Sequence, residues 1–248
     1  MPPLIIAHRG DSAHRPENTL AAFASALELG VELVEMDVQL TRDGAVVVMH
    51  DPAVDRTTDG RGRLRELTLR DVRRLSAGYP VRFGSTFAGE RVPTLAEALA
   101  FLRERARAMI EIKADSVTED EEGGIEALTV AEVRRLGMEK DVALISFSRG
   151  ALVRCRKLAP EIARGHVFER GKPGDFLAGA REAGCEVVMP YKSLLSDELK
   201  DRAREAGVKV ATWVVDDPGE LPGLARFDLF GIGSNRPGVM IEALRDEG

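Results

Sequence analysis

The stretch that decides the fold lies at residues 4–38 and reads LIIAHRGDSAHRPENTLAAFASALELGVELVEMDV. The apolar runs Leu4–Ala7 and Val31–Val38 predict two buried strands, and the segment Glu17–Leu29 between them has apolar residues at the helical spacings of three and four. Gly30 follows that segment, where glycine readily adopts the left-handed conformation that ends a helix. Strand, helix and strand in this order predict two parallel strands joined by a crossover helix.

The same alternation continues along the chain. Further apolar runs predict strands at Val46–Met49, Ala108–Ile112, Val142–Ile145, Ile162–Val167, Val187–Met189, Val208–Val215 and Leu229–Ile232. Helical spacing predicts helices at Thr94–Ala106, Gly124–Leu136, Arg149–Leu158, Asp175–Ala183 and Asp197–Ala206. Because this repetition implies parallel strands and eight such units close a barrel, the predicted fold is α/β, a (β/α)8 TIM barrel.

The segment from Asp51 to Val92 interrupts the alternation. It holds the turn-rich run Asp55–Gly62 and a short amphipathic piece at Leu69–Leu75. A connection this long inside a compact domain is usually functional or a small subdomain. We therefore expect one barrel domain over residues 1–248, with an insertion subdomain at about 51–92 after the strand that ends at His50.

Composition and charge exclude several classes of protein. The chain is 44% hydrophobic and 31% charged, without an apolar stretch near the roughly 20 residues that span a bilayer, so we expect a soluble protein with no transmembrane segment. A formal net charge of −6 without a basic stripe argues against a nucleic-acid partner. Met1 opens no signal-peptide pattern, and Cys155 and Cys185 are expected to be buried thiols rather than a disulfide. These features predict a cytoplasmic protein and leave its oligomeric state open.

Carboxylates stand at the ends of two predicted strands. Glu35 and Asp37 are two positions apart, so both side chains point to the same face of their strand. Glu111 and Lys113 repeat this spacing on a later strand. A lone carboxylate would more often pair with an arginine, but three of them at neighbouring strand ends form an oxygen-rich site that suits a hard divalent cation, Mg²⁺ or Ca²⁺.

Two histidines also follow predicted strands. His8 and His50 lie on different strands, and although a single histidine is more often structural, such a pair suits the roles of general base and general acid. Arg9 beside His8 carries a guanidinium that matches the oxygens of a phosphate. Together with the acidic site and Lys113, these residues indicate metal-assisted phosphoryl transfer. The sequence has no glycine-rich nucleotide loop, which argues against nucleoside-triphosphate and hydride chemistry.

Motifs spread over essentially the whole chain carry a family resemblance. They are His8-Arg9-Gly10, Pro16-Glu17-Asn18-Thr19, Glu35-Met36-Asp37-Val38, Thr41-Arg42-Asp43-Gly44, His50-Asp51-Pro52, Arg56-Thr57-Thr58-Asp59-Gly60, Glu111-Ile112-Lys113, Ser146-Phe147, Trp213 and Asn235-Arg236-Pro237. This set closely resembles the glycerophosphodiester phosphodiesterases. The resemblance implies the barrel with its insertion, and hydrolysis of small-molecule glycerophosphodiesters to glycerol 3-phosphate and an alcohol.

The resemblance also implies roles for the candidate residues. In the mechanism usual for the family, the glycerol 2-hydroxyl attacks phosphorus, the alcohol leaves, and water opens the resulting cyclic phosphate. One divalent cation takes part, Mg²⁺ or Ca²⁺ with Mn²⁺ as a further candidate. By similarity the acid/base pair is His8 and His50, the metal ligands are Glu35, Asp37 and Glu111, and the phosphate is held by Arg9 and Lys113.

Other positions are less clear from the sequence. Trp213 either forms an aromatic wall against the glycerol carbons or packs in the core. Glu17 and Asn18 either brace the loop after the first strand or begin the following helix. The chain also departs from the family pattern, because Asn235 stands where an aspartate is common and Asp216 stands where an asparagine is usual. These departures affect the rim of the predicted pocket and hence the preferred leaving group.

Two other functions are compatible with parts of this pattern. One is a lyase similar to sphingomyelinase D, which stops at the cyclic phosphate; Pro16-Glu17-Asn18-Thr19, the long insertion, and the lack of disulfide-type cysteines and of a secretory signal argue against it. The other is a non-catalytic barrel that senses polyol phosphates. Loss of a histidine or a carboxylate would favour such a binding protein, and none is lost here. The sequence therefore favours the hydrolase.

Overall fold

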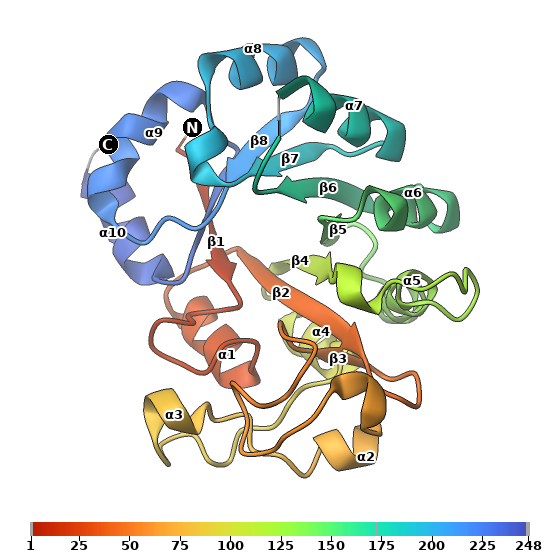
Figure 1. The fold of residues 1–248 in the computed structure, drawn as a ribbon. Coiled ribbons are helices and arrows are strands. Elements are labelled where there is room, and N and C mark those ends of the chain that lie inside the picture. Colours follow the sequence, from red (N-terminus) through yellow and green to blue (C-terminus); the bar gives the residue numbers. More distant parts are fainter. Residues whose placement is uncertain (1, 172, 247–248) are drawn as a thin grey trace.

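Eight parallel strands form a closed barrel in the computed structural model, which describes residues 2–171 and 173–246 (Figure 1). Their order around the barrel is β1, β9, β8, β7, β6, β5, β4 and β2, and β1 also pairs with β2, which closes the ring. The barrel strands are β1 (Leu4–His8), β2 (Leu33–Leu40), β4 (Arg107–Ile112), β5 (Val142–Ser146), β6 (Ala163–Phe168), β7 (Val187–Pro190), β8 (Lys209–Thr212) and β9 (Gly231–Ser234). The predicted (β/α)8 barrel is confirmed.

Helices cover the outside of the barrel (Figure 1). They are α1 (Leu20–Glu28), α4 (Leu95–Leu102), α5 (Ile125–Leu136), α6 (Arg149–Leu158), α7 (Pro173–Ala183), α8 (Asp197–Glu205), α9 (Leu221–Leu224) and α10 (Pro237–Asp246). Short 3₁₀ turns follow several strands, at η2 (Ala114–Ser116), η3 (Lys192–Leu194), η4 (Pro218–Glu220) and η5 (Ala225–Phe227). None of the helices in the described part of the chain is long and apolar enough to cross a membrane.

Capping residues set where the helices begin. The Oγ1 atom of Thr19 accepts a hydrogen bond from the backbone N–H of Ala22, so α1 starts at Leu20 rather than at the predicted Glu17. Thr94 and Glu97 form a reciprocal capping box at the start of α4. The predicted starts at Arg149 and Asp197 are confirmed, and the other predicted starts differ from the observed ones by one to three residues, because apolar spacing alone does not locate a cap.

The strand β3 (Val46–Val48) lies outside the barrel. It pairs antiparallel with the end of β2, with Val38 opposite Val48. The sequence predicts this run as one of the parallel strands, and that prediction is wrong. The physical reason is the connection, since a turn of a few residues after Leu40 can join antiparallel strands, whereas parallel strands need a crossover of a dozen or more residues.

The segment 51–92 forms a compact excursion beyond β3. It contains η1 (Leu64–Glu66), α2 (Leu69–Val72) and α3 (Pro80–Phe83). In Figure 1, α2 and α3 lie apart from each other on the side of the barrel where α1 and β3 lie. The segment buries its own small apolar cluster against β3, made of Val47, Met49, Val54, Leu64, Val72, Ala77 and Val92. This cluster fixes the excursion next to the strand that leads to His50.

Side chains inside the barrel change from apolar to polar along the strands. Ile6 and Leu33 belong to an apolar cluster whose buried residues all lie on strands. His8 and Glu35 follow them two positions further along the same strands. Because side chains alternate between the two faces of a strand, these polar residues also point inward. The rest of this interior cluster is Met109, Ile145, Val167, Val187, Met189 and Ala211. The polar layer therefore lies at the carboxyl ends of the strands.

Candidate active site

A cavity of about 360 Å³ opens at the carboxyl ends of the barrel strands. This is the end at which TIM-barrel enzymes build their active sites. Asp37 is fully buried beside the cavity. The other seven predicted site residues line it, namely His8, Arg9, Glu35, His50, Glu111, Lys113 and Trp213.

Three carboxylates meet on the neighbouring strands β2 and β4. Asp37 lies directly opposite Glu111 in the strand pairing, and Glu35 precedes Asp37 on the same face. One carboxylate oxygen of each residue lies within 4.8 Å of the others. Glu35 Oε1 and Asp37 Oδ1 are buried and have no hydrogen-bond partner within residues 2–171 and 173–246. Buried oxygens that form no hydrogen bond, in an all-oxygen set, fit a hard divalent cation such as Mg²⁺ or Ca²⁺.

The electrostatics of the three carboxylates favour added positive charge. Burial, followed by the charge of Asp37, raises the pKa of Glu111 to about 7 and the pKa of Glu35 well above its usual value. Burial would also raise the pKa of Asp37, but Arg9 and Lys113 lower it to about 2. Because added positive charge favours the ionised form of a carboxyl group, a nearby cation would lower the pKa of Glu35 and of Glu111.

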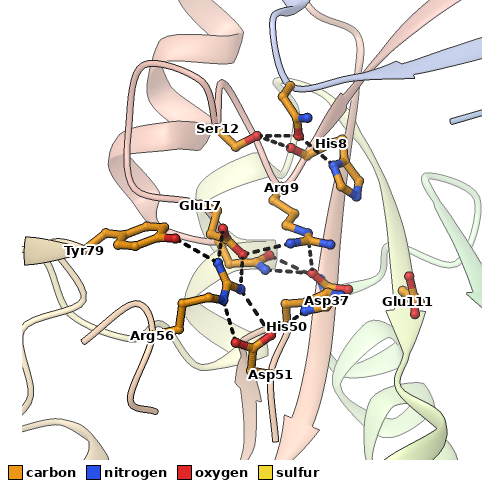
Figure 2. A network of polar contacts seen from close by, with 12 residues as sticks. His8, Arg9, Ser12, Glu17, Asp37, His50, Asp51, Arg56, Tyr79 and Glu111 are labelled. Carbon is orange, nitrogen blue, oxygen red and sulfur yellow. Dashed lines mark hydrogen bonds and ion pairs between the residues drawn. The ribbon is translucent and has the colours of Figure 1, made fainter. Parts of the chain in front are cut away.

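Arg9 connects the acidic cluster to the loop that follows β1. Its backbone is left-handed, with φ 58°, and directs its N–H to Glu35 Oε2 at 3.0 Å. The guanidinium lies between two acids (Figure 2), with Nε 3.1 Å from Asp37 Oδ2 and Nη1 2.9 Å from Glu17 Oε1. Although burial opposes the charged form, Asp37 and Glu17 raise the pKa of Arg9 above its ordinary value. The guanidinium therefore stays charged at the cavity wall.

Two further side chains hold Asp37 in place. Lys113 Nζ lies 3.4 Å from Asp37 Oδ1 and 2.7 Å from Glu111 Oε1. Asn18 Nδ2 donates to Asp37 Oδ2 at 2.8 Å, and the backbone N–H of Asp37 donates to Asn18 Oδ1 at 3.2 Å. Of the two roles considered for Asn18, the structure shows the first, since this residue braces the loop after β1 against β2.

His8 ends β1 and lies between the acidic cluster and the end of β9. Its Nδ1 is 2.8 Å from Asn235 Oδ1, and its Nε2 is 4.0 Å from Glu35 Oε2. Burial and the positive charge of Arg9 lower the pKa of His8 to about 4. The ring is therefore neutral at neutral pH.

His50 follows β3 and takes part in a network of ion pairs (Figure 2). Its Nδ1 donates to Asp51 Oδ1 at 2.6 Å, and Arg56 Nε donates to Asp51 Oδ2 at 2.6 Å. Arg56 also donates to Glu17 through Nη1 at 2.7 Å and Nη2 at 2.8 Å. Burial lowers the pKa of His50, and Asp37 opposes that change. Since Glu17 also binds Arg9, one network joins the segment 51–92 to both sides of the cavity.

Aromatic rings form the wall of the cavity at the later strands. Trp213 packs edge-to-face on Phe147 with ring centroids 5.6 Å apart, and on Tyr191 at 5.4 Å. Its indole Nε1 donates to the backbone oxygen of Met189 at 2.9 Å. Trp213 is thus a cavity wall whose orientation is fixed, and Phe147 lies beside it at the opening with 36% of its surface exposed.

The sequence prediction assigned no role to Asp51 or Arg56, although both belong to the motifs that carry the family resemblance. The sequence feature that could have pointed to Asp51 is its position directly after His50. Two other polar residues stay away from the cavity: His14 pairs with Asp11 at 2.8 Å, and Lys192 pairs with Glu220 at 2.7 Å.

Comparisons with known proteins show which family this chain resembles in sequence and structure. The model described as the glycerophosphoryl diester phosphodiesterase family matches residues 8–239. The glycerophosphodiester phosphodiesterase of Caldanaerobacter subterraneus is 36% identical over 249 residues, which cover 100% of both chains. That of Bacillus subtilis is 29% identical over 253 residues, covering 94% of this chain and 84% of the relative. A solved structure of an Oleispira antarctica phosphodiesterase in complex with the product sn-glycerol-3-phosphate has a TM-score of 0.87 and 29% identity, covering 98% of this chain and 97% of that one.

Proposed function

Since the chain belongs to the glycerophosphoryl diester phosphodiesterase family and is an enzyme of that family, we propose that it hydrolyses glycerophosphodiesters to glycerol 3-phosphate and an alcohol. The observation that carries this proposal is the meeting of two histidines and three buried carboxylates around one cavity. Acids, bases and cationic side chains on one cavity wall are the groups that phosphoryl transfer requires.

We assign the proton transfers to the two histidines by the partners of their Nδ1 atoms. His8 donates to an amide oxygen and is neutral, so its Nε2 accepts the proton of the attacking hydroxyl. His50 donates to the carboxylate of Asp51, which stabilises a charged imidazolium, so His50 protonates the leaving alcohol. Arg9 and Lys113 bind the phosphate oxygens from the same wall.

We propose that Glu35, Asp37 and Glu111 hold one divalent cation, Mg²⁺ or Ca²⁺ with Mn²⁺ as a further candidate. The fit rests on Glu35 Oε1 and Asp37 Oδ1, which are buried without a hydrogen-bond partner among the described residues, and on the raised pKa of Glu111 and Glu35. When bound, such a cation supplies positive charge to the phosphate oxygens in the transition state. The protein supplies the ligand spacing through the alternation of side chains along β2 and the register between β2 and β4.

The family mechanism adds a nucleophile to this arrangement. In it, the 2-hydroxyl of the substrate glycerol attacks phosphorus, and water then opens the cyclic phosphate. The aromatic wall at Trp213 suits this order of events, because it can hold the glycerol carbons while the alcohol leaves through the open side of the cavity.

The test is an assay of glycerol 3-phosphate release from glycerophosphocholine and glycerophosphoethanolamine, after chelation and after return of Mg²⁺, Ca²⁺ or Mn²⁺ one at a time. A matched substrate carries propane-1,3-diol in place of glycerol and so lacks the 2-hydroxyl. We expect cation-dependent release of glycerol 3-phosphate and of choline or ethanolamine from the natural diesters. From the analogue, whose phosphate product would be 3-hydroxypropyl phosphate, we expect no release of choline or ethanolamine. A cyclic phosphate as the final product would show a lyase instead, and equal turnover of the analogue would contradict the 2-hydroxyl as nucleophile.

We further propose that the chain works as one barrel domain, to which residues 51–92 add a small subdomain, and that it acts in the cytoplasm on small molecules. The buried thiols of Cys155 and Cys185 are free, as expected in a reducing compartment.

A further inference from the structure

A row of hydrogen bonds leads from β8 to His8. Asp216 follows β8, and its Oδ1 accepts from the hydroxyl of Ser234 at 2.9 Å and from the backbone N–H of Asn235 at 2.7 Å. Its Oδ2 accepts from Asn235 Nδ2 at 2.8 Å. The amide oxygen of Asn235 then lies 2.8 Å from His8 Nδ1. Three anchored contacts thus hold the Asp216 carboxylate, and the Asn235 amide lies between it and the histidine.

The direction of each proton in this row follows from the chemistry of the carboxylate. An ionised carboxylate only accepts hydrogen bonds, so the atom of Asn235 that faces Asp216 must be the NH₂ group. The amide oxygen must then face His8, and the hydroxyl of Ser12 lies within 2.9 Å of the same oxygen. An amide oxygen likewise only accepts, so His8 carries its proton on Nδ1 and has a free electron pair on Nε2.

We propose that Asp216 is a positioning residue that fixes the tautomer of His8 through Asn235. This inference rests on the proposed function, in which His8 Nε2 removes a proton from the attacking hydroxyl. If the Asn235 amide turned over, its NH₂ group would face Nδ1 and move the ring proton to Nε2, which could then accept no proton. Asp216 prevents that turn, because two oxygen atoms would otherwise face each other.

The tautomer can be observed without substrate. The chain has four histidines, so ¹⁵N-histidine labelling gives few imidazole signals, and His8→Gln identifies those of His8. Nitrogen chemical shifts distinguish a protonated ring nitrogen from an unprotonated one. In the wild-type protein near neutral pH we expect a protonated Nδ1 and an unprotonated Nε2 on His8.

The variants exchange the partners in this row. In Asp216→Asn two amides face each other, and the Asn235 amide can take either orientation. We therefore expect a mixture of His8 tautomers. We also expect kcat to fall on the order of 10- to 100-fold, the usual effect of losing a partner that orients a functional histidine. The double variant Asp216→Asn/Asn235→Asp reverses the pair and again places an acceptor against His8 Nδ1, so the single tautomer and most of the activity should return. Asp217→Asn is the matched control, because Asp217 is exposed and lies next to Asp216, and this variant should behave as the wild type.

The outcomes separate this inference from the proposed function. A single Nδ1-protonated His8 with unchanged kcat in Asp216→Asn overturns the inference, and so does a double variant that folds but regains neither the tautomer nor the activity. If Asp216→Asn does not fold, by circular dichroism, the double variant alone decides. If the tautomers change as expected while the wild-type protein hydrolyses no glycerophosphodiester, the positioning role stands and the proposed function fails.

Discussion

At the scale of single residues, the cavity histidines differ in exposure as well as in partner. The His8 side chain is 15% exposed and is held at Nδ1 by Asn235, whereas the His50 side chain is 32% exposed and is held at Nδ1 by Asp51. The more exposed ring can exchange its proton with solvent between turnovers. This difference agrees with His50 as the acid that regains its proton from solvent, and with His8 as the base that is less accessible to solvent.

We predict that His8→Gln and His50→Gln each lower kcat by roughly 10²- to 10⁴-fold, because each removes a proton transfer. The measurement is release of glycerol 3-phosphate from glycerophosphocholine by purified variants, with urea unfolding as the check on stability. His14→Gln is the control, since the side chain of His14 is 54% exposed and lies outside the cavity lining. Turnover near the wild-type rate in either cavity variant would show that its histidine is not a proton carrier.

The position of the acidic residues could be predicted from the sequence, but their partners could not. The alternation along a strand places Glu35 and Asp37 on one face, which needs only local information. The pairing of Asp216 with Asn235 needs the barrel, because it depends on β8 and β9 lying side by side. The two departures from the family pattern at these positions turn out to contact each other, and each is the complement of the other.

At the scale of elements, the segment 51–92 acts on the site through the side chains of Asp51 and Arg56. Arg56 donates to both Asp51, which orients His50, and Glu17, which binds Arg9. The Tyr79 hydroxyl lies 3.4 Å from Arg56 and belongs to the same segment. The excursion therefore supports the cavity from its rim, without adding a side chain of its own to the cavity lining.

We predict that Arg56→Lys lowers kcat/KM by roughly 10- to 100-fold, because a lysine cannot bind two carboxylates in the forked geometry of arginine. A hydrogen bond to a charged group contributes roughly 1.5–3 kcal/mol, and about 1.4 kcal/mol corresponds to a tenfold change in rate. Initial rates over a range of substrate concentrations give the value. Arg61→Lys in the same segment is the control, since Arg61 is exposed, and equal kcat/KM for the two variants would contradict the role of Arg56.

Elements with strong periodicity could be predicted best. The barrel strands and the helix α6 are found close to their expected ranges because apolar spacing reports which face is buried. The antiparallel direction of β3 could not be read from its run of valines, since such a run fits either kind of strand. The helix α10 was not predicted, because its apolar residues follow directly on the last strand and on Pro237.

At the scale of the whole molecule, the buried ionisable groups at one end of the barrel make the stability of the native state depend on pH. The pKa of Glu111 is raised to about 7, so the native state holds more protons than the unfolded chain between about pH 4.5 and 7. The contribution of Glu111 to the free energy of unfolding is complete below about pH 4.5 and is lost as the pH rises through about 7. His8 acts in the opposite sense, since its lowered pKa makes stability rise between about pH 4 and 6.5.

We predict that Mg²⁺ or Ca²⁺ raises the melting temperature more at about pH 8 than at about pH 5.5, because cation binding requires ionised carboxylates and competes with their protons. Comparing samples with and without cation at each pH cancels the contribution of His8. Differential scanning fluorimetry after chelation measures the effect. Glu111→Gln should abolish most of the difference between the two pH values, and an equal increase at both would argue against a cation at this cluster.

The pairing of β1 with β9 brings together the first and the last strand of the barrel. His8 and Asn235 are 227 positions apart, yet they share one hydrogen bond. A chain emerging from the ribosome has made its first histidine long before the residue that orients it. A partly synthesised chain that lacks Asn235 therefore cannot form the hydrogen bond that orients His8, and the site is completed only after the last strand has been translated.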